Sequence, residues 1–311
     1  MSSILKSSPK TPFNLRGQAW LLRSYPYLLL LPALSVIALL FGGGLVLALL
    51  QSLGLLGVGG DGHLTLAAYQ QALSHPEFLR ALGLSLYTAI MATGLSVMGS
   101  IGLALLLRST GRWASLACQI TLPIPHLVGV VGILLLLTPS GLVSRILYAI
   151  GWIQSDQDFP LLVNDGANLG VLLHFLWKEI PFMTLILLAV LRGIDREYET
   201  QARVLGASPW QCFWHVTLPL MKPGILSASL IVFGFIFGSF EVPFLLGSTF
   251  PRTLPVLVYR TFTNVDLTQR PTAIALGLIL SLCSTFMIMV YLWLTSDSPN
   301  SPNQNTKVRR S

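Results

Sequence analysis

Three charged side chains lie within long apolar stretches of the chain, where they could bind a polar solute or a partner charge. Lys178 and Glu179 are adjacent near the middle of the apolar run 169–191, and Glu241 lies in the run 225–246. A charge at the centre of a bilayer costs roughly 2.5–3.5 kcal/mol on insertion scales, so such groups usually pair or face water. We therefore expect these residues either to line a cavity for a solute or to fix the packing of their helices.

Aromatic residues and prolines flank the three charges. Trp177 precedes the lysine and Phe240 precedes the second glutamate, while Pro181 and Pro243 follow within a few residues. Breaks at proline are tolerated in a membrane where the freed backbone is buried in protein or lines a wet cavity. Trp177 and Phe182, near the first two charges, could form an aromatic wall of such a cavity, and the alternative is that aromatic residues in the spans simply pack against neighbouring helices.

The composition places these elements in a membrane. Apolar residues make up 53% of the 311 residues and charged residues only 10%, whereas soluble chains carry about 25% charged residues. A membrane helix needs roughly 20 apolar residues, and six runs meet that requirement. They are 25–53, 82–107, 113–137, 169–191, 225–246 and 271–294. We expect an all-α integral membrane protein with six transmembrane helices in one domain, 25–294, between polar tails 1–24 and 295–311.

Lysine and arginine residues predict the orientation of these spans. With the N-terminus inside, the inner segments hold 13 of them and the outer segments hold 5. The excess predicts a multi-pass protein of the bacterial plasma (inner) membrane, with both termini and the segment 192–224 in the cytoplasm. The net charge of +7 is then a topology signal. Nucleic-acid binding, which needs clustered basic and aromatic surface, is not expected.

The sequence lacks the motifs of nucleotide binding, metal binding and nucleophilic catalysis. It contains no G-x-x-x-x-G-K-[ST] phosphate-binding loop, no metal-binding cluster and no recognisable nucleophile arrangement. The cysteines, Cys118, Cys212 and Cys283, are too far apart for a metal or redox motif. We therefore expect no enzymatic activity and no cofactor bound by this chain, so the energy for any uphill transport must come from elsewhere.

A long polar stretch between two apolar runs, residues 197–225, predicts a helix–turn–helix. Residues 198–205 contain no helix breaker and end at Gly206, a residue suited to a helix C-terminus. Ser208 can cap a second helix that has Pro209 at its first position. Two short helices between membrane spans would present a docking surface for another protein.

The second of these helices has its own apolar stripe and its own predicted end. Phe213, Val216 and Leu220 recur at spacings of three and four, which places them on one face. We expect Pro219 and Pro223 to break this helix before the next span begins, because proline lacks a backbone N–H.

This stretch resembles the EAA loop of type I ABC importer permeases. The family pattern is Glu-Ala-Ala, three residues, Gly, nine residues, Ile, one residue and Leu-Pro. Nine residues separate Gly206 from Val216, and Leu218 and Pro219 follow in register. The first half departs from the pattern, because the family glutamate falls on a threonine and Glu199 is displaced by one residue. The residues that the resemblance assigns to coupling are Glu199, Thr200, Gln201, Ala202, Gly206, Ala207, Phe213, Val216, Leu218 and Pro219.

The resemblance implies a six-span permease subunit and a set of partners. These are cytoplasmic ATP-binding-cassette ATPase subunits that bind the ATP, a second permease subunit (identical or different), an external or periplasmic solute-binding protein, and the lipid bilayer. The implied function is a translocation path for a small hydrophilic solute. Two acidic groups against one basic group in the spans favour a polyamine-like cation, with a sugar or another neutral or anionic solute as the alternative. An ion-coupled secondary transporter and a structural or insertion factor are the competing classes.

Overall fold

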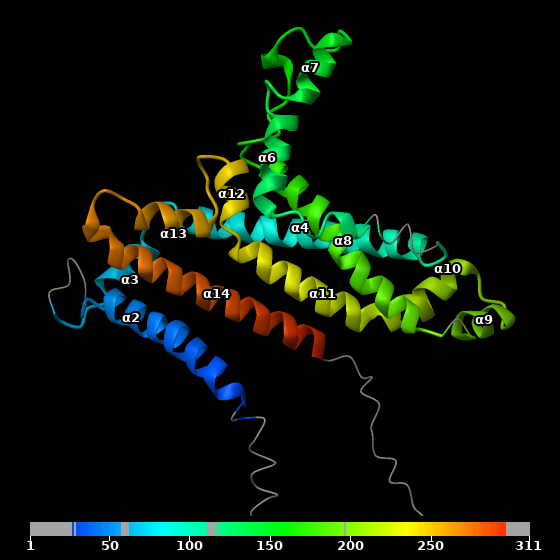
Figure 1. Ribbon diagram of the computed structural model, residues 1–311, viewed down its shortest axis with the longest axis horizontal. Helices are drawn as coiled ribbons and strands as arrows, with labels where there is room; N and C mark the ends of the chain where they lie inside the picture. The colour runs from blue at the N-terminus through cyan, green and yellow to red at the C-terminus, as the bar shows by residue number, and fades with distance from the viewer. Residues whose placement is uncertain are drawn as a thin grey trace, which may run out of the picture.

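The computed structural model describes residues 27, 29–56, 62–110, 116, 118–195 and 197–296. The expected tail 1–24 and most of the tail 295–311 lie outside these residues. The described parts of the chain contain helices and no strand (Figure 1). The elements are η1 Ala38–Gly42, α2 Gly43–Ser52, α3 Ala67–Leu73, α4 Phe78–Leu107, α6 His126–Leu137, α7 Leu142–Ala149, η2 Asp156–Asp158, α8 Leu169–Gly193, α9 Glu197–Val204, α10 Pro209–Cys212, η3 Phe213–Thr217, α11 Leu218–Gly238, α12 Glu241–Leu246, α13 Leu254–Phe262, η4 Leu267–Gln269 and α14 Arg270–Ser296.

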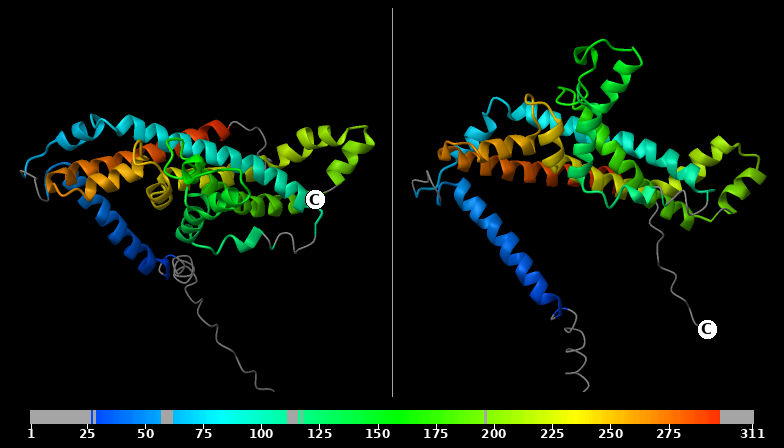
Figure 2. Two further views of the ribbon diagram at one scale, coloured as in Figure 1. Left: turned by 90° about the horizontal axis from the view of Figure 1, so that it is seen from above. Right: turned by 45° about the horizontal axis from the view of Figure 1, so that its top comes forward.

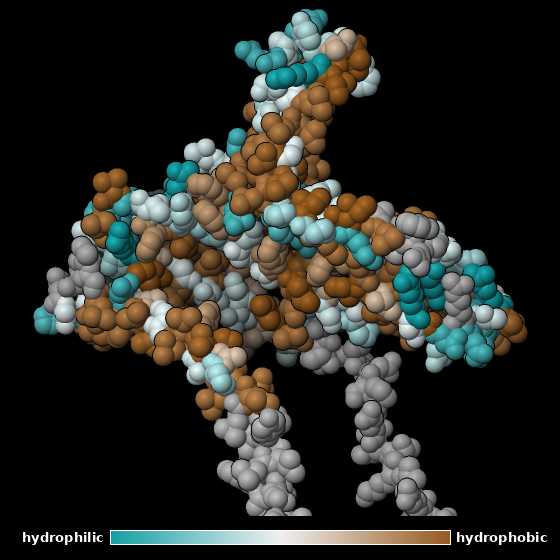
Figure 3. All heavy atoms as spheres, viewed as in Figure 1, coloured by the Kyte–Doolittle hydropathy of each residue, from teal (hydrophilic) through white to brown (hydrophobic). Residues whose placement is uncertain are grey.

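Among the described residues, six helical segments are long and apolar enough to cross a membrane. They are Leu29–Ser52, Phe78–Leu107, His126–Ala149, Leu169–Gly193, Pro209–Gly238 and Leu267–Trp293. The predicted all-α fold with six spans is therefore confirmed. Figure 3 shows hydrophobic side chains over most of these helices, with hydrophilic residues gathered around α9 and at the tip beyond α7.

The third span differs from its predicted bounds. The predicted run 113–137 begins in residues that are only partly described, and its helix is interrupted between Thr121 and Pro125. Helix α6 begins at His126, directly after that break. The break follows from Pro123 and Pro125, because proline lacks an N–H and disfavours helical geometry in the residue before it. The amphipathic helix predicted near 143–150 is present as α7, which extends away from the other helices (Figure 1).

The prediction that two prolines end the second loop helix was wrong. Residues Pro209–Gly238 form one helical segment, in which α10 passes through the π-helical turn η3 into α11. Pro219 lies in the first turn of α11 and Pro223 lies inside it. Proline is tolerated near the start of a helix, and in membrane helices local adjustments such as π-turns accommodate it. The span instead ends at Gly238, and α12 follows after a two-residue break at Ser239 and Phe240.

Small side chains allow the central helices to pack closely. Helix α4 runs alongside α8 and α11 (Figure 2), and its buried face includes Ala89, Ala92, Ser96 and Ser100. Interfaces between membrane helices are enriched in such residues because small side chains let backbones approach. The main buried cluster joins this face of α4 to apolar residues of α6, α8, α11 and α12.

The packing of α6 against α8 can be tested at two glycines of α6. A Cβ atom added at Gly129 would lie 2.6 Å from the Trp177 ring and 2.9 Å from the His174 ring, whereas one added at Gly132 would meet nothing within 4 Å. We expect Gly129→Leu to destabilise the protein by about 1–3 kcal/mol, the usual cost of overpacking. Thermal melting in detergent, followed by the reactivity of buried cysteines, would measure this. Gly132→Leu is the matched control, and equal melting of the two variants would contradict the packing described.

Candidate solute path and coupling surface

Lys178 holds the broken segment before α6 against α8. Its Nζ donates hydrogen bonds to the carbonyl oxygens of Thr121, Leu122 and Ile124, at 2.7, 2.9 and 2.5 Å. The side chain is buried, with 7% exposure. An ammonium group has three N–H donors, so these carbonyls occupy all of them. The lysine therefore satisfies backbone acceptors that the break leaves open, and no N–H remains for a solute.

Glu179 lies beside this lysine and faces a cavity of about 390 Å³. The cavity is lined by Leu122, His126, Lys178, Glu179, Phe182, Ile231, Val232 and Phe235. Helices α8 and α11 and the start of α6 thus enclose it. Glu179 is 6% exposed and has no hydrogen-bond partner among the described residues. Its carboxylate is therefore a buried acceptor group available to whatever enters the cavity.

Two histidines and a second carboxylate adjoin the same region. Nδ1 of His126, the first residue of α6, lies 3.1 Å from Nε2 of His174 on α8. His126 also interacts electrostatically with Lys178 and with Glu241. Glu241 is exposed and begins α12 at the break in the fifth span. Glu179 therefore lines the cavity together with His126, and Glu241 interacts electrostatically with that same histidine.

Three aromatic residues were proposed from the sequence: Phe182 lines the cavity, whereas Trp177 and Phe240 lie outside its lining. Trp177 is 37% exposed and its ring centroid lies 5.9 Å from that of His174. Phe240 packs on Tyr259 at 4.6 Å between centroids. Phe235, which the sequence analysis did not single out, lines the cavity and contacts the His126 ring at 5.0 Å. A phenylalanine in an apolar run carries no local signal that distinguishes it from its neighbours.

The polar segment 197–225 contains the predicted turn. Gly206 has φ of +88°, the left-handed conformation that glycine adopts without strain. Ser208 caps α10, because its Oγ accepts from the Gln211 N–H at 3.3 Å and its own N–H donates to Gln211 Oε1 at 2.8 Å. This reciprocal arrangement is a capping box. The turn that separates α9 from α10 is thus set by local sequence.

Apolar side chains at this turn are exposed. Val204 is 82% exposed, Leu205 is 88% exposed and Trp210 is 68% exposed. The residues that the resemblance aligned with the first half of the motif, Thr200 and Gln201, are exposed as well. Such a cluster at the end of a membrane protein, surrounded by polar residues, is the usual mark of a protein-binding surface.

Six membrane segments, a cavity that contains Lys178 and Glu179 beside the helix break before α6, and an exposed helix–turn–helix together define the membrane subunit of a transporter. The family described as "binding-protein-dependent transport system inner membrane component" matches residues 96–297, and the chain belongs to it. It is therefore a multi-pass membrane component of a transport system and not an enzyme. The predicted resemblance is confirmed at the level of the family.

Individual relatives carry different substrate names. The chain is 31% identical over 225 residues to the molybdenum transport system permease protein ModB of Mycobacterium tuberculosis, covering 70% of this chain and 80% of that protein. It is 29% identical over 213 residues to the putrescine transport system permease protein PotI of Escherichia coli K12, covering 67% and 69%. A crystal structure of a bacterial ABC transporter for alginate matches the fold with a TM-score of 0.73 at 19% identity, covering 92% of this chain and 100% of that one.

The contacts of Lys178 generate a stability prediction. A fully buried carbonyl left without a donor costs about 1–3 kcal/mol, and the three carbonyls bound by Lys178 are partly buried, so Lys178→Met should lower the apparent melting temperature of the purified protein. Lys222→Met, at an exposed lysine on α11, should leave it unchanged. A Lys178→Met protein that melts with the parent would show that the broken segment does not depend on this side chain.

Proposed function

We propose that this chain forms the translocation path of an ATP-driven importer for a small hydrophilic solute. The observation that carries the proposal is the exposed apolar turn at Val204–Trp210, placed within a segment whose second half follows the family's coupling-loop spacing. Separate cytoplasmic ATPase subunits would bind ATP and dock on this turn. The excess of lysine and arginine in the segments joined to it supports a cytoplasmic location for the turn and for both termini.

The other partners follow from the kind of transport system. A binding-protein-dependent system delivers its solute through an external or periplasmic binding protein, and we propose that this protein meets the outer surface around α7 and α13. A second permease subunit, identical or different, would complete the path across the lipid bilayer. Family membership argues against the ion-coupled secondary transporter that the intramembrane charges also suggested.

The free carboxylates favour a cationic solute of the polyamine type. Lys178 directs all its donors to backbone carbonyls, so it offers no hydrogen bond to an anion. Among the described residues, Glu179 interacts with Lys178 through charge alone and forms no hydrogen bond, and Glu241 is exposed beside the same region. The names of the relatives divide between a molybdenum and a putrescine system. An oxyanion such as molybdate is therefore the second candidate, and a neutral sugar is the third.

Docking on the turn is tested by changing its most exposed apolar residue. We expect Leu205→Glu to abolish co-purification of the cognate ATPase, because a desolvated charge would oppose burial of the turn. Val265→Glu is the matched control, since Val265 is 96% exposed but lies in the segment between α13 and η4. If Leu205→Glu still retained the ATPase, or if Val265→Glu lost it, the turn would not be the ATPase-docking surface.

The solute class is tested with the same two carboxylates. A ligand screen on the cognate binding protein, with putrescine, molybdate and maltose as probes, identifies the class first. For a cation, Glu179→Gln and Glu241→Gln should each reduce ATP-driven uptake by about tenfold, the effect of losing roughly 1.4 kcal/mol of attraction. For maltose both changes should have little effect, because an amide still forms hydrogen bonds. Cation uptake at the parental rate in both variants would exclude the acidic path.

A further inference from the structure

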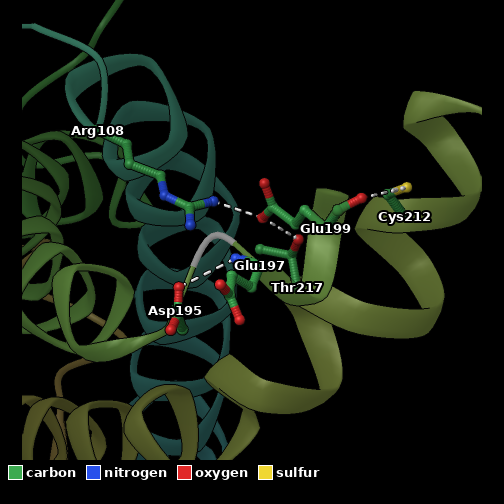
Figure 4. A network of polar contacts seen from close by, with 6 residues as sticks. All are labelled: Arg108, Asp195, Glu197, Glu199, Cys212 and Thr217. Carbon is green, nitrogen blue, oxygen red and sulfur yellow. Dashed lines mark hydrogen bonds and ion pairs between the residues drawn. The ribbon is translucent and has the colours of Figure 1, made fainter. Parts of the chain in front are cut away.

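Glu199 joins three elements at the cytoplasmic end of the bundle. It lies on α9, and its Oε1 accepts hydrogen bonds from Nη1 of Arg108 at 2.5 Å and from the hydroxyl of Thr217 at 2.7 Å (Figure 4). Arg108 is the residue that ends α4, and Thr217 is the last residue of η3. The side chains of Arg108 and Glu199 are only 12% and 22% exposed. This carboxylate therefore contacts the rest of the chain and does not project into solvent.

The charge on Glu199 is stabilised by these contacts. Burial alone would raise its pKa, but the hydrogen bonds from Arg108 and Thr217 and the charges of Arg108 and Arg203 outweigh that effect and lower it below the ordinary value of 4.5. A lowered pKa keeps the carboxylate ionised at neutral pH, and its contribution to stability is lost only as the pH falls toward the folded-state pKa. Charge-assisted bonds of this kind are roughly twice as strong as neutral ones.

Helix α4 connects this contact to the wall of the cavity. Gly99 of α4 comes so close to α8 that an added Cβ would lie 2.9 Å from the side chain of Ile180, the residue after Glu179. Gly99 lies in α4 and Arg108 is the C-cap residue directly after it, and nine residues of helix span about 13–14 Å. A rigid element thus runs from the Arg108–Glu199 pair to the segment of α8 that carries the free carboxylate.

We propose that Glu199 is a positioning residue that ties the docking turn to α4, so that displacement of the turn by an ATPase moves α4 and, with it, the cavity wall on α8. The proposal rests on the function proposed above. The proposal also gives a role to Glu199, which is displaced by one residue from the position of the family glutamate. Thr200 stands where the family pattern has its glutamate, while the neighbouring carboxylate forms its contacts within the chain.

The test is a charge exchange in the reconstituted complex. Wild type, Glu199→Gln, Arg108→Gln and the double variant Glu199→Arg with Arg108→Glu would each be assembled with the ATPase and binding protein in liposomes. The measured quantity is ATP hydrolysed per solute imported, with putrescine or molybdate as the probe, whichever the wild type imports. We expect each single variant to raise this ratio about fivefold or more, the lower range of allosteric coupling, and the exchange to restore part of it.

Two further variants separate coupling from folding. Glu197→Gln changes an exposed carboxylate on the same helix that forms no hydrogen bond or ion pair with the residues drawn in Figure 4, and should leave the ratio unchanged. Thr217→Val removes one hydrogen bond with little change of shape and should give an intermediate ratio even if the charge variants fail to assemble.

An unchanged ratio in Glu199→Gln and Thr217→Val, with wild-type assembly, would overturn the proposal while leaving the importer function intact. Failure of the wild type to bind the ATPase would instead overturn the proposed function itself.

Discussion

The structure depends on how three backbone carbonyls are satisfied inside the membrane. A break in a membrane helix leaves backbone carbonyl oxygens without their helical hydrogen bonds. Lipid tails cannot donate hydrogen bonds, so protein or water must supply the donors. Here Lys178 supplies all three from the facing helix. The break then becomes a stable feature, and α6 can begin at His126 next to α8. The cavity beside Glu179 exists because this interruption separates the chain on either side of it.

The same lysine explains how a carboxylate can remain available at that depth. An isolated buried charge would be expensive, but the ammonium of Lys178 stands next to Glu179 along α8 without forming a hydrogen bond to it. The electrostatic field of the lysine thus supports the carboxylate while its donors are directed elsewhere. Nine residues further along the chain from the contact of Gly99 with α8, at the C-terminal end of α4, Arg108 and Glu199 form a direct pair instead. One charge pair lies at the proposed solute path, and the other joins two elements of the fold.

The parts of this account that were predictable from the sequence are those set by local pattern. The six spans follow from apolar length, and the turn at Gly206 and Ser208 follows from glycine and capping preferences. The continuation of the helix through Pro219 and Pro223 was not predictable from the single-residue rule, because a π-helical turn and the surrounding bundle accommodate them. The partners of Lys178 lie 54 to 57 residues away and Glu199 lies 91 residues from Arg108. Such contacts depend on the packing of α4, α6 and α8 and leave no local signal.

The central claim is that a path for positive charge passes the cavity beside Glu179. It is tested most directly by placing a single cysteine at Phe235, which lines the cavity and is 45% exposed, in a chain whose native cysteines are replaced. The rates of its reaction with a cationic and an anionic thiosulfonate reagent of similar size would be compared. The account predicts faster reaction with the cationic reagent, and loss of that preference when Glu179 is also changed to Gln. Equal rates, or faster reaction with the anionic reagent, would contradict it.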